Sequence, residues 1–348
     1  MDDISQILQS DIDDGVITGG AVLAAKDGKV FYERGFGFTS PEKKYAMNAD
    51  TVLDVASTTK VAAVITALLI CHHRGLIDFD APFTEYLKDF SAPLYETVTV
   101  RDLANHRSGF GDVLGETQRR YFDESGTQML KNVLTTPPPH PLTLHAHYAC
   151  WNYILLSLLL ESLTGESLKD FCEREIFASL QMDSTSLGKP CAGIPIERLG
   201  QTPNTSRPGE ISDFVAFRIY RDGGCTGNAG LFTSARDFGK LLQCHLDGGV
   251  TPSGKRLFSE TELAEIAPDR AYSYHGYRRF GWSIYEKYLN REMFGTVLFH
   301  SGWSGQTVLF DMSRNMYGCV LTTRMGDYER AKQNRHDILH KLWKMTEQ

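Results

Sequence analysis

The feature that most constrains this chain is the position of its β-rich segments, which lie at the two ends. Residues 20–38 (GAVLAAKDGKVFYERGFGF) form two apolar runs joined by Asp27-Gly28, a dipeptide typical of a two-residue hairpin turn. Three short β-rich segments bounded by turn residues lie near the C-terminus, at 294–302, 305–313 and 316–324. An amphipathic segment at about 328–346 predicts a final helix, and most of the chain between the two ends reads as helical.

Glycine and serine residues mark the expected helix ends in the middle of the chain. The run TKVAAVITALLICHHRG closes at Gly75 and the run WNYILLSLLLESLTG closes at Gly165, and glycine is favoured where a helix stops. Ser167 opens the next helix, with Asp170 at the capping-box spacing.

The simplest assembly is an α+β fold. Its antiparallel sheet is built from the N- and C-terminal segments and flanked by helices, with a helical middle region packed alongside. We therefore expect residues 1–348 to form one catalytic unit. Its α/β part would cover about 1–56 and 230–348, and its helical part about 57–229. A functional site is expected at their junction.

Composition excludes several classes of partner. The net charge is −7, with 42% hydrophobic and 23% charged residues, which is typical of a globular chain and unlike a nucleic-acid-binding protein. The longest apolar stretch, Val61–Cys71, is shorter than the roughly 20 residues that span a bilayer, and the acidic N-terminus lacks signal-peptide features. The seven scattered cysteines favour free thiols. We expect a cytoplasmic protein that binds neither nucleic acid nor membrane; its oligomeric state stays open.

Three stretches satisfy the pattern S-x-x-K, which is weak by itself: Ser40–Lys43, Ser57–Lys60 and Ser186–Lys189. Ser40 precedes a proline in a polar turn, and Ser186 precedes a glycine and a proline. Only Ser57 opens a long apolar helix, where a spacing of three residues places both side chains on one face.

Nucleophilic catalysis needs that geometry, because a serine hydroxyl is a poor nucleophile unless a neighbouring base removes its proton. Lysine serves as that base if desolvation and nearby positive charge lower its pKa. The helix N-terminus would offer free N–H groups to a developing oxyanion. The alternative is that Ser57 only caps the helix and Lys60 lies at the surface.

Further segments decide between these alternatives. AHYACWNYILLSLLLESLTG places Tyr148 just before a buried helix, and LFHSGWSG places His300, Ser301 and Gly302 on a C-terminal strand. In this order the sequence resembles the serine β-lactamase/penicillin-binding-protein superfamily, in its class C-like branch of β-lactamase-fold esterases and D-amino-acid peptidases. LANHRSGF (103–110), GNAGLFTSARDFGKLL (227–242) and LTTR (321–324) are similar to further segments of that superfamily.

The resemblance implies a role for each matched residue. Ser57 would attack an acyl carbonyl, while Lys60 and Tyr148 share the proton transfers. The backbone N–H groups of Ser57 and Trp303 would form the oxyanion hole, and Gly302 would leave room for a substrate along the strand. The alternatives are a structural aromatic at Tyr148, a turn glycine at Gly302 and a buried structural tryptophan at Trp303.

Three positions depart from the family pattern. His300 stands where β-lactamases carry a lysine, and because histidine is mostly neutral at pH 7 it should anchor a substrate carboxylate less well. Cys150 aligns with an asparagine that contacts the catalytic lysine and the substrate, and a thiol is a weak hydrogen-bond partner. Asn152 does not replace that asparagine in this register. Thr323 also stands where asparagine is common.

The expected function is therefore that of a serine hydrolase acting through an acyl-enzyme on small esters or amides. The alternatives are a penicillin-binding or sensing protein that does not turn over, and a β-lactamase. We expect no cofactor and no metal, because His145, His147 and Cys150 match no zinc signature. A small buried residue is the usual role of a cysteine such as Cys150, in preference to a nucleophile. The absence of G-x-S-x-G disfavours an α/β-hydrolase.

Overall fold

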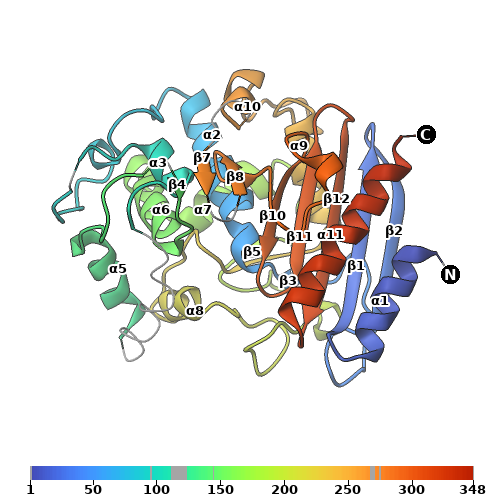
Figure 1. The fold of residues 1–348 in the computed structure, drawn as a ribbon. Coiled ribbons are helices and arrows are strands. Elements are labelled where there is room, and N and C mark those ends of the chain that lie inside the picture. Colours follow the sequence, from blue (N-terminus) through green and yellow to red (C-terminus); the bar gives the residue numbers. More distant parts are fainter. Residues whose placement is uncertain are drawn as a thin grey trace.

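The computed structural model describes residues 2–94, 96–110, 124–143, 145–266, 271–273 and 276–347, and it confirms the α+β fold (Figure 1). The strands are β1 (Ile17–Lys26), β2 (Lys29–Gly37), β3 (Leu53–Asp54), β4 (His145–Ala146), β5 (Ser186–Leu187), β6 (Leu231–Thr233), β7 (Ala271–Ser273), β8 (Gly276–Arg279), β9 (Trp282–Ser283), β10 (Leu298–Gly302), β11 (Gln306–Asp311) and β12 (Met316–Arg324). The α-helices are α1 (Asp3–Asp13), α2 (Thr66–His73), α3 (Val100–Ala104), α5 (Gly126–Thr135), α6 (Cys150–Thr164), α7 (Leu168–Cys172), α8 (Phe214–Arg221), α9 (Ala235–Leu246), α10 (Glu260–Ile266) and α11 (Tyr328–Met345). Shorter helical turns include η1 (Ala56–Thr58), η2 (Lys60–Ile65) and η4 (Glu173–Phe177).

The main sheet joins the two ends of the chain, as predicted. Its strand order is β2-β1-β12-β11-β10-β9-β8-β7-β4, so the N-terminal hairpin pairs antiparallel with the last strand through β1 and β12. The hairpin turns at Asp27 and Gly28, whose φ angles of 51° and 72° are both left-handed. This is the backbone that a type I′ turn requires, which explains why Asp-Gly marks it in the sequence.

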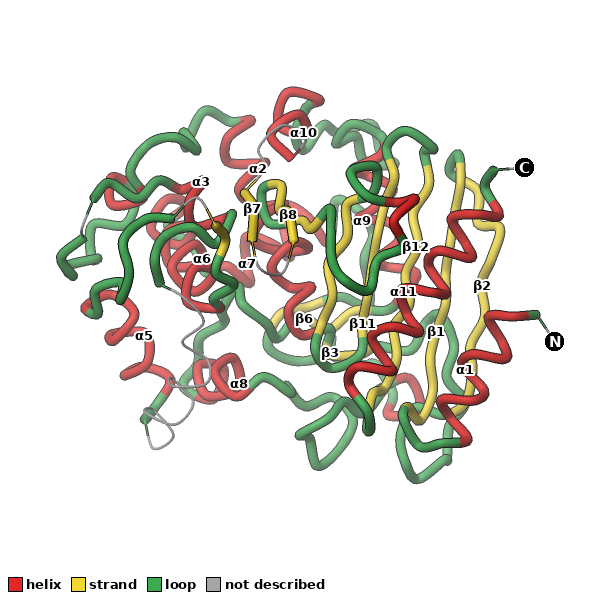
Figure 2. The backbone as a smooth tube through the Cα atoms, viewed as in Figure 1, coloured by secondary structure: helices red, strands yellow, loops and turns green. Residues whose placement is uncertain are grey.

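Helices cover both faces of this sheet. The N- and C-terminal helices α1 and α11 lie together on one face (Figure 2), where Ile4, Leu8, Leu339 and Trp343 pack against the strands. Helix α9 packs on the opposite face against β1 and β12. Beyond β10 the sheet continues toward the helical region that contains α2, α3 and α6 (Figure 1). The division into an α/β part and a helical part stays a prediction.

The sequence did not predict the far half of the sheet. Strands β9, β8, β7 and β4 have two to four residues each, too few to produce a readable alternation of polar and apolar side chains. Strand β4 is parallel to β7, whereas the other pairs in this sheet are antiparallel. A second small sheet, β3-β6-β5, was also not predicted.

The predicted helix ends are confirmed. Gly75 and Gly165 follow α2 and α6 with left-handed φ angles of 68° and 73°. The hydroxyl of Ser167 accepts from the backbone N–H of Asp170 at the start of α7. All seven cysteines are free thiols. Within the described residues, no helix combines the length and the apolar character needed to cross a membrane.

Helix α11 closes one face of the sheet, and its packing gives a test of the fold. Leu339 is 1% exposed and contacts the strand at Gly318. Leu339→Ala should therefore lower the free energy of unfolding by about 2–5 kcal/mol, because it leaves a cavity between helix and sheet. The control is Leu76→Ala, at a leucine that is 44% exposed, which should change it by about 0.5 kcal/mol or less. Urea denaturation measures both, and equal effects would contradict this packing.

Candidate active site

A strained turn carries Ser57. Strand β3 ends at Asp54, and Ala56, directly before Ser57, has a φ of 44° that non-glycine residues rarely adopt. The carboxylate of Asp54 stabilises this turn: Oδ1 accepts from the backbone N–H of Ala56 at 3.1 Å. Its Oδ2 accepts from the backbone and hydroxyl of Ser212 at 2.7 and 2.5 Å. The buried Asp54 therefore ties the turn before Ser57 to the segment that precedes α8.

The helix after this turn is irregular, where the sequence predicted one regular helix starting at Ser57. Ser57 lies in the 3₁₀ turn η1, Lys60 begins the π-helix η2, and only residues 66–73 are α-helical. Threonine hydroxyls bond back to the main chain here, from Thr58 to Val55, from Thr59 to Ala56 and from Thr66 to Val61. Such bonds compete with regular helical bonding, and π-turns are frequent at functional sites.

Lys60 is fully buried and makes three polar contacts. Its Nζ donates to Ser57 Oγ at 3.1 Å, to the main-chain oxygen of Asn228 at 2.8 Å and to Cys150 Sγ at 3.4 Å. Three acceptors match the three N–H groups of an ammonium. Ser57 itself is half-buried, so a substrate could reach its hydroxyl. The surface alternative for Lys60 does not fit this environment.

Tyr148 joins the pair from the segment before α6. Its ring centroid lies 5.0 Å from Lys60 Nζ, and the ring packs on that of His106 at 4.6 Å. His106 is buried, and its Nδ1 accepts from the backbone N–H of Ala149 at 3.2 Å and lies 3.1 Å from Asn152 Nδ2. Burial, together with the charges of Arg278 and Lys60, holds the pKa of His106 well below its usual value. A neutral histidine thus positions the phenol.

The protonation states differ from the expectation that Lys60 has a lowered pKa. Burial alone would lower the pKa of Lys60, but Cys150, Tyr148 and Asp213, when ionised, raise it, and the net direction is upward. Burial raises the pKa values of Tyr148 and Cys150, although Lys60 opposes this. At neutral pH the free protein therefore holds an ammonium beside a phenol and a thiol. A base forms when the Lys60–Tyr148 pair loses one proton.

Strand β10 brings the other predicted residues to the turn. A Cβ added at Gly302 would lie 2.6 Å from the main-chain oxygen of Val55, so glycine is required where this strand meets the Ser57 turn. Gly302 is thus explained by packing against Val55, in addition to the expectation that it leaves room for a substrate. Ser301 and Trp303 on either side of Gly302 are half-buried, and Ser301 Oγ lies 3.1 Å from Thr307 Oγ1 across the hairpin.

Trp303 is held by Arg324, the last residue of the LTTR segment. Nε of Arg324 donates to the main-chain oxygen of Trp303 at 2.8 Å. Its guanidinium carbon lies 5.1 Å from the centroid of the Trp303 ring. These contacts hold the carbonyl group and the ring of Trp303, the residue whose backbone N–H was predicted to complete the oxyanion hole.

His300 is 3% exposed, and neither ring nitrogen has a partner of good hydrogen-bond geometry among the described residues. Burial and the charges of Arg278 and Lys60 hold its pKa well below its usual value. The ring is therefore neutral at pH 7, as expected from the residue type.

The predicted departures from the family pattern have different surroundings. Cys150 begins α6 and contacts the lysine, at the position where the family carries asparagine. Asn152 instead lies among Ser108 and His106 and does not contact Lys60. Thr323 bonds to Thr18 and to both backbone groups of Gly19 on β1, so its substitution affects the sheet.

Sequence reasoning missed several residues that build this site. Asn228 supplies the main-chain acceptor of Lys60, while its side-chain amide donates to Asp213 Oδ1 at 3.1 Å and accepts from Thr226 Oγ1 at 3.1 Å. It lies in the GNAGLF segment, whose similarity to the family was the available signal. Arg278 places its guanidinium 5.1 Å from the centroid of the Tyr148 ring. No motif marks it in the sequence.

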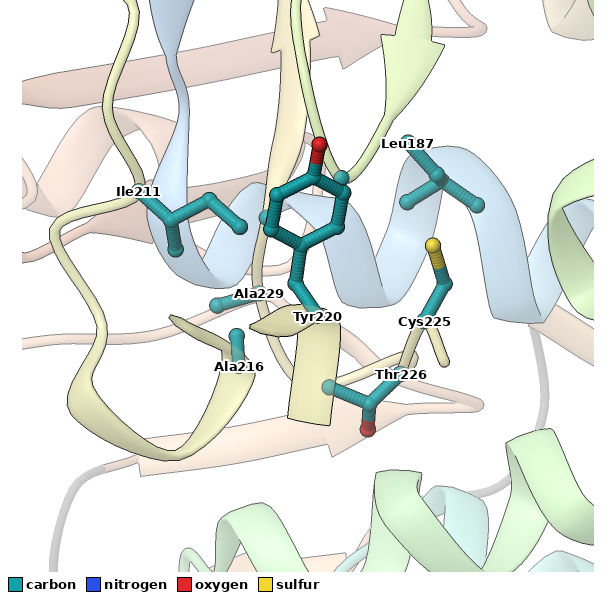
Figure 3. Close-up of a pocket in the computed structure, with 9 residues that line it drawn as sticks. Leu187, Ile211, Ala216, Tyr220, Cys225, Thr226 and Ala229 are labelled. Atoms are coloured by element: carbon teal, nitrogen blue, oxygen red, sulfur yellow. The ribbon is translucent and has the colours of Figure 1, made fainter. Parts of the chain in front are cut away.

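Figure 3 shows a separate hollow that contains none of the predicted residues. Its lining includes Leu187, Ile211, Ala216 and Tyr220, with Cys225 and Thr226 at one end. It adjoins the loop of Asn228, and its almost wholly apolar lining carries no pair of groups for acid–base chemistry. Within the described ranges, no three His, Cys, Asp or Glu side chains are placed to hold a metal ion.

Comparison with known proteins identifies the family. The family described as Beta-lactamase matches residues 4–342. The chain belongs to the beta-lactamase family. Its antiparallel sheet with flanking helices also resembles that of a class C beta lactamase from Rhodobacter sphaeroides. That structure matches with a TM-score of 0.74 and 20% identity over 98% of this chain and 99% of that one.

Two relatives of this beta-lactamase family member carry different activities in their names. An N-acetylmuramyl-L-alanine amidase from Bacillus subtilis (strain 168) is 26% identical over 92% of this chain and 80% of its own length. The esterase/beta-lactamase LipL from Mycobacterium tuberculosis (strain ATCC 25618 / H37Rv) is 31% identical over 51% of this chain and 41% of its own length. The relatives are thus hydrolases of amides and esters.

The buried carboxyl of Asp54 makes stability depend on pH. Burial raises its pKa from 3.8 to about 6, against the lowering effect of bonds from Ser212 and Ala56. Because the folded pKa exceeds the unfolded one, its contribution is fully present below pH 4 and is lost as pH rises to about 6. The unfolding free energy of the wild type minus that of Asp54→Asn should fall by about 3 kcal/mol over this range. Urea denaturation at pH 4, 5, 6 and 7 measures it; a constant difference would contradict the shift.

Proposed function

We propose that this chain is a serine hydrolase that acts through an acyl-enzyme on small esters or amides. The observation that carries the proposal is the 3.1 Å contact between the half-buried hydroxyl of Ser57 and the fully buried amine of Lys60. Burying an ammonium is costly unless its N–H groups are bonded, and here one of the three bonds goes to a hydroxyl that a substrate can reach. Membership of a family of hydrolases supports the same conclusion.

The chemistry follows from the groups around this pair. Ser57 Oγ forms a bond to the substrate's carbonyl carbon while its proton passes to the Lys60–Tyr148 pair. The carbonyl oxygen becomes an oxyanion stabilised by the N–H groups of Ser57 and Trp303. The bond to the leaving group then breaks, and the pair returns the proton to the leaving oxygen or nitrogen. Attack of water on the acyl-enzyme, with its proton taken by the same pair, releases the acid and restores Ser57.

Cys150 favours esters over amides within this proposal. Its thiol lies 3.4 Å from Lys60 Nζ and is a weaker hydrogen-bond partner than a carboxamide. A side-chain amide there could accept from the lysine and donate to the substrate's acyl-amide oxygen at once. Without this contact, an amide substrate is oriented less well in the site. An activated ester is more reactive, so its hydrolysis depends less on that orientation.

Replacement of the nucleophile tests the proposal directly. Ser57→Ala should reduce hydrolysis of p-nitrophenyl acetate about a thousandfold or more, because the remaining groups have no atom to acylate. Ser40→Ala removes the serine of another S-x-x-K stretch and should retain activity. Circular dichroism checks that both variants fold. Substantial turnover by a folded Ser57→Ala variant would rule out this nucleophile.

A second function, a sensor that acylates without turnover, is favoured by Cys150 and by the raised pKa values of Lys60 and Tyr148. Intact mass after incubation with the ester and with a chromogenic cephalosporin separates the two. Steady product release supports the hydrolase, whereas a stable one-equivalent adduct that Ser57→Ala abolishes supports the sensor. Neither product nor adduct would contradict both.

Restoring the family amide gives a further test. Cys150→Asn should raise the ratio of kcat/KM for a p-nitroanilide to that for the matching p-nitrophenyl ester by roughly tenfold, the size expected for one hydrogen bond to a charged or developing charged group. Cys150→Ser is the control, because a hydroxyl contacts Lys60 without supplying the amide donor. An unchanged ratio in Cys150→Asn would show that this position does not select between amides and esters.

A further inference from the structure

Arg278 carries a largely buried positive charge for which the described residues provide little compensation. The residue is 8% exposed, yet its only hydrogen bond to a described residue runs from Nη1 to the main-chain oxygen of Gly281, at 3.2 Å. Within the described ranges no carboxylate oxygen lies within ion-pair distance of it. A guanidinium has five N–H groups, so most of its donor capacity is not used by these contacts.

Arg335, which is 1% exposed, likewise has no ion pair with a described residue, but it donates to two acceptors, Thr307 Oγ1 and the main-chain oxygen of Ala331. Three further arginines have carboxylate partners or more acceptors than Arg278. Arg101 forms ion pairs with Asp80 and Glu265, and Arg107 pairs with Asp102. Arg324 has two main-chain acceptors for its side chain. Burying a charge without a partner is costly, and a ligand of opposite charge would offset that cost.

The position of Arg278 is at the candidate active site. Strand β8 pairs with β9 through Arg278 and Ser283, and Ser283 in turn pairs with Phe299 of β10, next to His300. The guanidinium lies 5.1 Å from the centroid of the Tyr148 ring. Arg278 therefore lies two strands away from the position where β-lactamases carry their lysine, and close to the phenol of Tyr148.

The carboxylates of the site are already engaged elsewhere. Asp54 accepts from Ala56 and Ser212, and Asp213 accepts from Ala216 and Asn228. Neither forms an ion pair with Arg278. His300 is neutral, its ring nitrogens have no partner of good hydrogen-bond geometry among the described residues, and the charge of Arg278 contributes to its lowered pKa. It offers one N–H donor without adding a charge.

We propose that Arg278, assisted by neutral His300, binds a carboxylate of the substrate, so that the preferred substrates are small esters or amides bearing a free carboxylate. A cation without a charged partner among the described residues matches one negative charge, and a guanidinium binds a planar carboxylate through two parallel hydrogen bonds. Arg278 is then a specificity-determining residue, and it replaces from β8 the charge that β10 lacks. This inference rests on the proposed hydrolase function.

The test uses esters that differ only in this charge. The mono-p-nitrophenyl ester of adipic acid is compared with p-nitrophenyl hexanoate, and 4-acetoxybenzoate with 4-methylphenyl acetate, which place the carboxylate on the acyl or on the leaving side. Arg278→Gln should lower the charged-to-neutral ratio of kcat/KM at least roughly tenfold in one pair, mainly through KM. Arg278→Lys should retain part of the preference for the charged ester. Arg256→Gln, which removes an exposed arginine, is the control.

The outcomes separate specificity from structure. If Arg278 only supports Tyr148, Arg278→Gln will lower kcat/KM equally for both esters of each pair. The charged-to-neutral ratio will then stay unchanged, which overturns the proposal. If the protein hydrolyses none of the esters, the hydrolase function fails and binding decides the role of Arg278. In that case calorimetry with adipate and with benzoate should show binding of at least one to Ser57→Ala and not to the Ser57→Ala, Arg278→Gln double variant. If the single and the double variant bind these carboxylates equally, or if neither variant binds them, the proposed role of Arg278 is overturned.

Discussion

The site depends on one requirement, which is that a fully buried ammonium find three acceptors. Lys60 meets it with Ser57 on its own helix, the main chain at Asn228 and the thiol of Cys150 on α6. These acceptors come from three parts of the chain that are far apart in sequence, so the helical middle and the segment leading into β6 must assemble before the lysine is stable. The contact that positions the candidate nucleophile is therefore also one that the fold needs.

A second constraint is the close approach of the turn at Ala56 to the end of β10. Gly302 permits this approach, Asp54 stabilises the left-handed residue before Ser57, and Arg324 holds the carbonyl group of Trp303. Each of these contacts is made by a group that would not itself react. In the proposed mechanism they would hold the backbone N–H groups of Ser57 and Trp303 in place before a substrate binds, as electrostatic stabilisation of an oxyanion requires.

The sequence predicted what has a local pattern or a family motif, and little else. The hairpin at Asp27-Gly28, the C-terminal strands, the helix ends and the approach of Ser57, Lys60 and Tyr148 could all be read from spacing and resemblance. The strands β7–β9 could not, since two to four residues carry no periodicity. Arg278 was missed for the same reason: it lies in such a strand, and only the tertiary structure shows how few of the described residues accept a hydrogen bond from it. The regular helix predicted at Ser57 was wrong because tertiary context and threonine hydroxyls outweigh helical propensity there.

On the proposed assignments, Cys150 and Arg278 act in a common direction. Cys150 removes a side-chain amide that would bind the substrate's acyl-amide oxygen, whereas Arg278 adds a charged contact with a carboxylate elsewhere on the substrate. Binding energy from a remote group can be used to orient the reacting carbonyl, provided that the rest of the substrate is rigid or short enough to transmit it. The length between carboxylate and carbonyl then becomes the property that this site selects. A fixed guanidinium on a short strand, packed on the ring of Tyr148, would enforce that length more strictly than a lysine on a flexible stem.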